Sequence, residues 1–345
     1  MTDPNKWKSS FRNFPKIPRG KQWLIGGEPG SATLEQIITS KLLNNVSINN
    51  EERTIILECI RFYNLLYGEL RTFDYSSLNN HEISDFILYI GYAFNFLPMH
   101  TNSVELFEAY RLVQNKDSNS KTNTSQVSYP PLEIVKKYNL YNRASSPSST
   151  AFYCSDSIDV VFKEIKPSKS SIVTLGIWQP KNKKEFHSYP ISSNPSAQLV
   201  NKDAQRSEIA YRMLGQRLHP LFIGFIDGYF RVLNYEYSKP VKNHLEYLIS
   251  AYFSEKIFEI DQVGWSIDCI IYPSVGNEYS NSNLAFKPSI VDQYLELKSV
   301  TEIEIIETFY EKPIINNDPR KISVANVKIL KKSKSILENG DIIWI

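Results

Sequence analysis

The chain has 345 residues, of which 39 are basic and 37 acidic, so its formal net charge is +2. This balance argues against a nucleic-acid-binding protein that depends on a strong positive field, and the length favours two domains. The polar N-terminal segment lacks the apolar core of a signal peptide, and no apolar run is long enough to span a membrane. Three single, widely spaced cysteines are typical of free thiols in a reducing compartment. We therefore expect a cytoplasmic protein with no membrane or direct nucleic-acid partner.

The first hundred residues have a helical pattern. Apolar residues recur at steps of three and four from Glu51 to Leu70, and again from His81 to Phe96. Ser103 is expected to cap a further helix that carries Phe107. We therefore predict a small all-helical domain at residues 1–103 and a second domain at residues 104–345.

A polar, low-complexity stretch follows at residues 116–128, with the sequence KDSNSKTNTSQVS. Such a composition offers too little apolar surface to bury and indicates a flexible loop. A linker between domains and an insertion within the second domain would both have this composition.

The stretch from Asn142 to Lys166 predicts a loop, a short strand and a helix in succession. The serine and proline residues after Arg143 favour turns, because serine side chains bond to the nearby backbone. Ala151 to Cys154 is an aromatic-rich strand candidate, in which alternation puts Tyr153 on the opposite face from Phe152 and Cys154.

The helix that follows is expected to have Ser155 as its cap and to stop at Pro167. Its apolar residues fall at helical spacing and predict one buried stripe, formed by Ile158, Val161, Phe162 and Ile165. Glu164 borders this stripe. We therefore expect its carboxylate to lie at the edge of a core rather than fully in solvent.

The remainder of the chain mixes strands and helices and ends in strands. Residues 181–201 are predicted to be irregular and polar. The predicted strands are Ile172–Trp178, Ile267–Tyr272, Val300–Phe309, Ile322–Leu330 and Asp341–Ile345, and the predicted helices are Ser207–Leu218 and Leu245–Phe253. This order predicts an α+β fold.

Several parts of the chain, in this order, resemble the signature of the RES domain family, bacterial proteins with an ADP-ribosyltransferase-like fold. The family's arginine loop, tyrosine strand and glutamate helix match Arg143, Tyr153 and Glu164, at spacings of ten and eleven residues. Downstream, Ser274 in IIYPSV ends an apolar strand as in the family, and Asn283 in NLAF follows it.

The resemblance implies a RES domain at residues 104–345, with residues 116–128 as an insertion inside it. In FEAYR, Arg111 is similar to the arginine that opens the family's domain. The resemblance implies catalytic roles for three residues, Arg143, Tyr153 and Glu164. It implies substrate contacts for Arg111, Ser145, Ser274 and Asn283.

The same resemblance implies an NAD-degrading enzyme, either an NAD phosphorylase or a glycohydrolase, that acts as a bacterial toxin or defence effector. NAD is then the substrate, and no further cofactor and no metal are expected. The implied partners are phosphate, an Xre-type antitoxin protein and a second copy of the chain.

Cleavage of the nicotinamide–ribose bond passes through an oxocarbenium-like transition state. An arginine can bind the pyrophosphate or the ribose end through its bidentate fork, and an aromatic ring can stack on the nicotinamide. A carboxylate near the ribose can bind its hydroxyl groups and stabilise the developing positive charge. Arg143, Tyr153 and Glu164 are the residue types that this reaction requires.

Two alternatives stay open. The motif does not decide the acceptor of ADP-ribose, and three loop residues depart from the family, with Asn142 and Ser148 in place of glycines and Ser145 in place of an asparagine. A mono-ADP-ribosyltransferase would use the same first half-reaction and modify a protein. A catalytically degenerate module would bind a nucleotide or a partner without turnover. The histidines have no metal-binding spacing and the sequence has no GxSxG motif, so metal-dependent and serine hydrolases are not expected.

Overall fold

The computed structural model describes residues 13–18, 37–42, 44, 46–94, 101–115, 119–191, 201–216, 218–262, 265–276, 279–311 and 322–345. Its helices, within these ranges, are η3 (Ile38–Leu42), α3 (Asn50–Thr72), η4 (Tyr75–Ser77), α4 (Asn80–Ala93), η6 (Thr124–Gln126), α5 (Leu132–Tyr138), α6 (Ile158–Ile165), α8 (Lys202–Gly215), α9 (Pro220–Ser238), η7 (His244–Tyr247), α10 (Leu248–Glu259) and α11 (Pro288–Tyr294).

The described strands are β1 (Asn102–Glu105), β2 (Ala109–Gln114), β3 (Phe152–Ser155), β4 (Ile172–Pro180), β5 (Glu185–Pro190), β6 (Asp261–Gln262), β7 (Trp265–Ser266), β8 (Cys269–Pro273), β9 (Ser282–Phe286), β10 (Leu295–Glu311), β11 (Ile322–Ile336) and β12 (Ile342–Trp344). Ten of them form one sheet in the order β1-β5-β8-β9-β3-β2-β4-β10-β11-β12, and β6 pairs with β7. Neighbouring strands of the ten-stranded sheet are antiparallel, apart from the parallel pair β5 and β8. This combination of helices with one large, mainly antiparallel sheet confirms the predicted α+β class.

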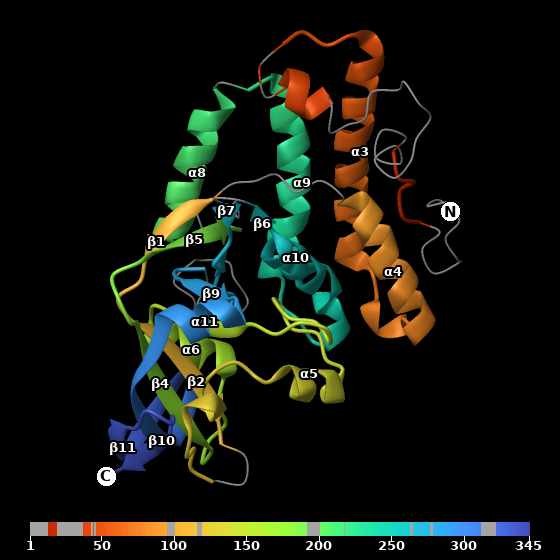
Figure 1. The fold of residues 1–345 in the computed structure, drawn as a ribbon. Coiled ribbons are helices and arrows are strands. Elements are labelled where there is room, and N and C mark those ends of the chain that lie inside the picture. The colour runs from red at the N-terminus through yellow and green to blue at the C-terminus, as the bar shows by residue number, and fades with distance from the viewer. Residues whose placement is uncertain are drawn as a thin grey trace.

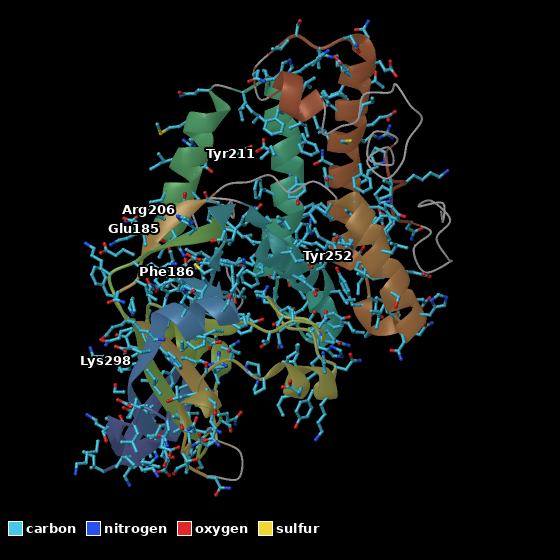
Figure 2. All side chains as sticks on the ribbon, viewed as in Figure 1. Glu185, Phe186, Arg206, Tyr211, Tyr252 and Lys298 are labelled. Carbon is cyan, nitrogen blue, oxygen red and sulfur yellow. The ribbon has the colours of Figure 1, made fainter. Side chains whose placement is uncertain are left out.

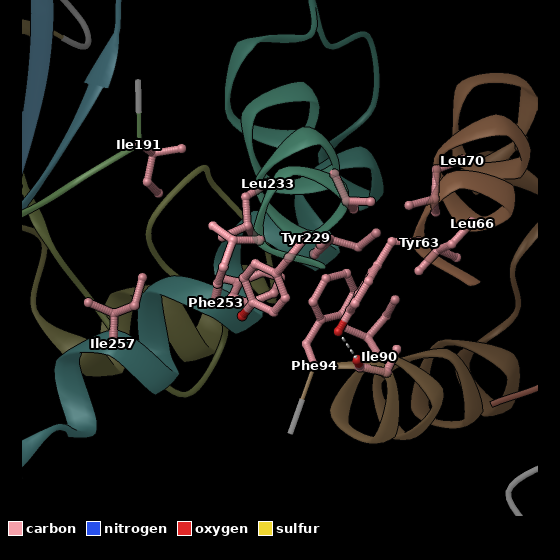
Figure 3. Close-up of a cluster of buried hydrophobic side chains, with 14 of the residues drawn as sticks. Tyr63, Leu66, Leu70, Ile90, Phe94, Ile191, Tyr229, Leu233, Phe253 and Ile257 are labelled. Carbon is pink, nitrogen blue, oxygen red and sulfur yellow. Dashed lines mark hydrogen bonds between the residues drawn. The ribbon is translucent and has the colours of Figure 1, made fainter. Parts of the chain in front are cut away.

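The helices α3, α4 and α9 gather at one end of the molecule, and β10, β11 and the C-terminus lie at the other (Figure 1). The larger hydrophobic core includes Tyr63 of α3 and Tyr229 of α9, and it extends to Tyr272 on the sheet. Figure 3 shows part of this core, in which the Tyr63 hydroxyl donates to the carbonyl of Ala93 at 2.9 Å. The helices predicted in the first hundred residues therefore share their core with later helices and with the sheet.

Alternation along the central strands separates this core from a second one. Tyr153, Tyr272 and Ala285 face the helices, whereas Phe152 and Cys154 belong to a cluster on the opposite face of the sheet. The prediction that Tyr153 faces away from Phe152 and Cys154 is confirmed. The face that carries Tyr153 is therefore the face that α9 and α10 cover.

The prediction of a helix after Ser103 is wrong. Residues 102–105 form β1, which pairs with β5, and residues 109–114 form β2, which lies between β3 and β4. Phe107, expected on the helix, lies in the connection and is 77% exposed. Because apolar residues at mixed spacing fit either structure, pairing with distant strands decides the outcome. The expected domain boundary between residues 103 and 104 falls inside β1.

The two long N-terminal helices are confirmed as α3 and α4. Each is preceded by a capping asparagine, Asn49 or Asn79, whose side chain accepts backbone hydrogen bonds. The glutamate three residues after each cap, Glu52 or Glu82, accepts from the backbone amide of the asparagine, so both helices carry a capping box. The helix α9, by contrast, lies where the sequence predicted no element. Its buried residues nevertheless recur at steps of three and four, at Phe222, Phe225, Ile226, Tyr229, Val232 and Leu233, so the spacing that predicts an amphipathic helix is present in this segment too.

Two segments predicted to be irregular contain ordered structure. The polar region at residues 181–201 includes β5, while residues 192–200 lie outside the described ranges. In the expected flexible insertion, the backbone amide of Thr124 donates to the carbonyl of Gly340 at 2.8 Å. The amide of Ile342 donates to the carbonyl of Thr122 at 2.8 Å, so the described part of this segment is bonded to the C-terminal hairpin.

Candidate active site

The carboxylate of Glu164 receives three hydrogen bonds on one oxygen. Its Oε1 accepts from Ser274 Oγ at 2.5 Å, from Asn283 Nδ2 at 3.0 Å and from the backbone amide of Gly276 at 3.1 Å. Glu164 belongs to α6, Asn283 to β9, and Ser274 and Gly276 to the segment after β8. The fold thus brings together three residues that the sequence singled out, Glu164, Ser274 and Asn283.

The prediction of which residues form the buried stripe of α6 is partly wrong. Ile158 and Ile165 are 40% and 46% exposed, and the buried residues are Val160 and Val161. Glu164 follows Val160 by one helical turn and is itself exposed. The helix α6 packs on the sheet through Val160, Val161 and Phe162, and the exposed Glu164 is held by hydrogen bonds rather than by a surrounding core.

The start of α6 also differs from the prediction. Its N-cap residue is Ser157, whose side chain makes no capping bond, rather than Ser155. The Ser155 hydroxyl donates to the carbonyl of Ser282 at 2.8 Å instead, and this bond joins β3 to β9.

Gly276 is a site residue that sequence reasoning missed. A Cβ atom added to it would lie 2.6 Å from the carbonyl oxygen of Lys163, so the backbone of the Ser274 segment lies directly on α6. Only glycine allows this approach while its amide reaches Glu164. The signal in the sequence is a glycine two residues after Ser274, at the end of a strand.

Arg143 contacts the C-terminal turn of α9. Its Nη1 donates to the carbonyl of Glu236 at 3.0 Å and its Nη2 to the carbonyl of Lys239 at 3.2 Å. Its guanidinium lies 5.0 Å from the ring centre of Tyr247 and 5.9 Å from that of Tyr272. A cation at this end of a helix interacts favourably with the helix dipole, so Arg143 stabilises the C-terminal turn of α9.

Tyr272 is the common neighbour of the predicted catalytic residues. Burial raises the pKa of its phenol well above the usual value, and Tyr153 raises it further while Arg143 lowers it. Glu164 also raises the pKa of Tyr272, so all three side chains lie within electrostatic range of this hydroxyl. Tyr272 precedes Ser274 by two residues, a strand spacing that places both on one face.

The hydroxyl of Tyr153 supports the arginine loop. It accepts from the amide of Ala144 at 2.7 Å and donates to Ser145 Oγ at 3.1 Å. Burial raises the pKa of Tyr153 to about 12, against the opposing effect of these two hydrogen bonds. Ser145, predicted to contact substrate, is buried and engaged with Tyr153 and with Asn142 Nδ2 at 3.3 Å.

Arg111 lies on a strand, β2, and not among the donors to Glu164. Its Nη1 donates to the carbonyl of Tyr153 at 2.7 Å, and its guanidinium lies 5.3 Å from the ring centre of Phe152. Strands β2 and β3 share a single paired position, Tyr110 with Ser155. The side chain of Arg111 therefore supplies a hydrogen bond between β2 and β3 where their backbones are not paired. Burial lowers the pKa of Arg111 to about 10.

The loop residues that depart from the RES pattern have contacts of their own. Ser148 Oγ donates to Glu255 Oε1 at 2.9 Å, and Ser146 Oγ bonds to Ser148 Oγ at 2.8 Å. The loop is thus tied to α10 through Glu255. These serines stabilise the loop that carries Arg143.

The comparisons with known proteins give no match, either to a protein-family model or to a curated protein. Among the described residues, histidine, cysteine and acidic side chains do not gather in groups of three or more that could hold a metal ion. Across the same ranges, every helix is too short or too polar to cross a bilayer.

Proposed function

We propose that this chain cleaves the nicotinamide–ribose bond of NAD, with Glu164 as the carboxylate that stabilises the positive charge developing on the ribose. The observation that supports this most directly is the convergence of Ser274, Gly276 and Asn283 on Glu164 Oε1. A carboxylate held by three donors is oriented before the substrate arrives.

The second oxygen of Glu164 is the group that would act on substrate. Within the described part of the chain, no donor bonds to Oε2, and the side chain lies at the surface. Oε2 would accept hydrogen bonds from the ribose hydroxyls, which strengthen as positive charge develops on the sugar.

Arg143 has a different role in this proposal from the one that the family resemblance implies. Two of its donors already bind α9 carbonyls, which leaves three of the five for a ligand. We propose that Arg143 contributes positive charge beside Tyr272 and attracts the pyrophosphate, rather than clamping it with its full fork.

The resemblance to the RES domain family supports a toxin or defence effector that passes ADP-ribose to water or to phosphate. In this reading the partners would be NAD, phosphate and an Xre-type antitoxin. A second copy of the chain and a protein acceptor of ADP-ribose remain alternatives to be tested alongside.

The test compares wild-type protein with Glu164→Gln and with Asp159→Asn, an exposed carboxylate on the same helix. Each is incubated with NAD, with and without phosphate, and NAD loss and nicotinamide release are measured. We expect Glu164→Gln to lower the rate by about a hundredfold or more, since it removes charge stabilisation at the reacting centre, and Asp159→Asn to leave it unchanged.

Faster loss with phosphate would identify phosphorolysis, and an unchanged rate would identify hydrolysis. Transfer of label from NAD to protein would identify a mono-ADP-ribosyltransferase. Equal rates for wild type and Glu164→Gln would overturn the role of Glu164. No NAD loss and no labelled protein under any condition would favour a binding module.

A further inference from the structure

A cavity of about 980 Å³ lies between the C-terminal halves of α3 and α9 and one side of α8. This volume is at the upper end of the range for small-molecule sites, which is roughly 300 to 1,000 Å³. In Figure 2, Tyr211 projects from α8 on the side that faces α9, and its hydroxyl donates to Asp227 of α9 at 2.7 Å. Helices provide most of the lining, Pro190 of β5 and Tyr279 also contribute to it, and Glu164 is not among the lining residues.

Aromatic side chains form much of the cavity wall, including Tyr67, Phe73, Tyr75, Phe230 and Tyr235. The cation-binding position on two of these rings is already filled. Lys239 Nζ lies 4.3 Å from the ring centre of Tyr75 and 5.4 Å from that of Tyr235. Its side chain is only 5% exposed and bonds to Glu236 Oε2 at 2.7 Å. A cationic ligand would therefore find this aromatic cage occupied.

The acidic groups of the cavity are engaged by neighbouring donors. Asp227 accepts from Tyr211, and Glu208 forms an ion pair with Arg212 at 2.6 Å. Glu246 accepts from the backbone amides of Lys242 and Asn243 at 3.2 Å and 3.1 Å. These bonds partly satisfy the negative charges at the wall.

Two arginines of the cavity have donors to spare. Arg231 is exposed and donates one bond, to Asn64 Oδ1 at 3.1 Å, while the Arg71 guanidinium lies 5.7 Å from the ring centre of Tyr67. In the described part of the chain, neither forms an ion pair with a carboxylate. Guanidinium groups in this state bind phosphate, sulfonate or carboxylate through charge-assisted hydrogen bonds.

We infer that this cavity is a second binding site, which takes a small anionic aromatic molecule with its ring against the aromatic wall and its anionic group on the guanidinium groups of Arg71 and Arg231. The site goes beyond the NAD cleavage proposed above and does not depend on it. It meets the first site at the C-terminal turn of α9, because Lys239 lines the cavity and its carbonyl accepts from Arg143.

The test uses 1-naphthyl phosphate as the probe and titrates it into the full chain by calorimetry. The variant carries Arg71→Glu and Arg231→Glu together, and Arg53→Glu, on the same helix as Arg71 but away from the cavity, is the matched control. We expect saturable binding of one probe per chain to wild type and to Arg53→Glu. The double variant should bind at least about tenfold more weakly, since charge-assisted hydrogen bonds are lost.

Two further measurements distinguish binding in this cavity from binding at the Glu164 site and from non-specific hydrophobic binding. Glu164→Gln should bind the probe with unchanged affinity, and uncharged 1-naphthol should bind wild type at least about tenfold more weakly than the phosphate does. Circular dichroism checks that the double variant is folded, and Arg71→Gln with Arg231→Gln replaces it if it is not. Absence of saturable binding, equal affinity in the arginine variants, or loss of binding in Glu164→Gln would each overturn the inference.

Discussion

The three donors that bind Glu164 Oε1 come from residues 110, 112 and 119 positions further along the chain. A local sequence pattern can place a glutamate on a helix, but it carries no information on which distant groups will meet it. At the scale of single residues, the candidate site therefore depends on a few close approaches, and at Gly276 the approach leaves no room for a side chain.

Replacing Gly276 by alanine is expected to lower the free energy of unfolding by about 1–3 kcal/mol, because the new Cβ would press on the backbone of Lys163 and overpack the contact. Chemical denaturation measures this change. Gly68→Ala is the control, since an added Cβ at this exposed position of α3 meets nothing within 4 Å. That control should raise stability by about 0.5–1 kcal/mol through helix propensity. A neutral Gly276→Ala variant would argue against the close contact with α6.

Two core tyrosines provide a second test at this scale. The hydroxyl of Tyr229 is buried with no hydrogen-bond partner in the described residues, whereas that of Tyr63 donates to Ala93. Tyr229→Phe should therefore raise the free energy of unfolding by about 1 kcal/mol, and Tyr63→Phe should lower it by a similar amount. Thermal unfolding of both variants checks the opposite signs. A loss of stability in Tyr229→Phe would indicate a hydrogen bond to buried water.

At the scale of elements, the C-terminal turn of α9 connects the helical layer to the candidate site. Arg143 binds two carbonyls there and lies over two aromatic rings, so this side chain is part of the packing between loop and helix. The same contacts make Arg143 a poor choice for testing function alone, because its removal affects stability and charge together.

Arg143→Ala is expected to lower the free energy of unfolding by about 2–3 kcal/mol, since hydrogen bonds made by a charged donor are lost and two carbonyls lose a partner. Arg143→Lys should recover only part of this, because an ammonium group cannot reproduce the fork. Urea denaturation of both variants, with the exposed Arg61→Ala as a reference, measures the difference. If Arg143→Ala were as stable as Arg61→Ala, the contact between Arg143 and α9 would not contribute to the free energy of unfolding.

Sequence patterns predicted several elements that have one buried face, although α9, which has the same apolar spacing, was not predicted. The helices α3 and α4 show regular apolar spacing, and the alternation in β3 correctly separated Tyr153 from Phe152. The segments β1 and β2 were predicted as a helix, because their apolar residues fit both periods and the choice is made by pairing with β5, β3 and β4. The same limit explains why Gly276 and the α9 turn were not predicted as parts of the site.

At the scale of the whole molecule, burial of phenol groups is a general feature of this chain. Burial raises the pKa of Tyr229 and Tyr272 well above the usual value and brings that of Tyr129 to about 12, with help from Asp292. An unfolded tyrosine has a pKa of about 10. The native state therefore holds more protons than the unfolded state above this pH, and its stability must fall as the pH rises.

We expect these phenols to have little effect on the melting temperature below about pH 9 and to lower it steadily as the pH rises above about 10, the pKa of an unfolded tyrosine. Ultraviolet absorbance of phenolate should rise together with unfolding, because most buried phenols ionise only when the core opens. Phenolate formation that is complete while circular dichroism remains native would contradict this explanation.

The turn between Glu236 and Lys239 has a thermodynamic consequence, because one carbonyl-bearing segment faces the cavity on one side and Arg143 on the other. A ligand in the cavity that shifts this turn changes the position of Arg143, and hence the affinity of the other site. Linkage requires that a ligand bound beside Arg143 alter affinity in the cavity by the same factor. Titrating either ligand in the presence of the other would measure a single coupling free energy, and the two values must agree.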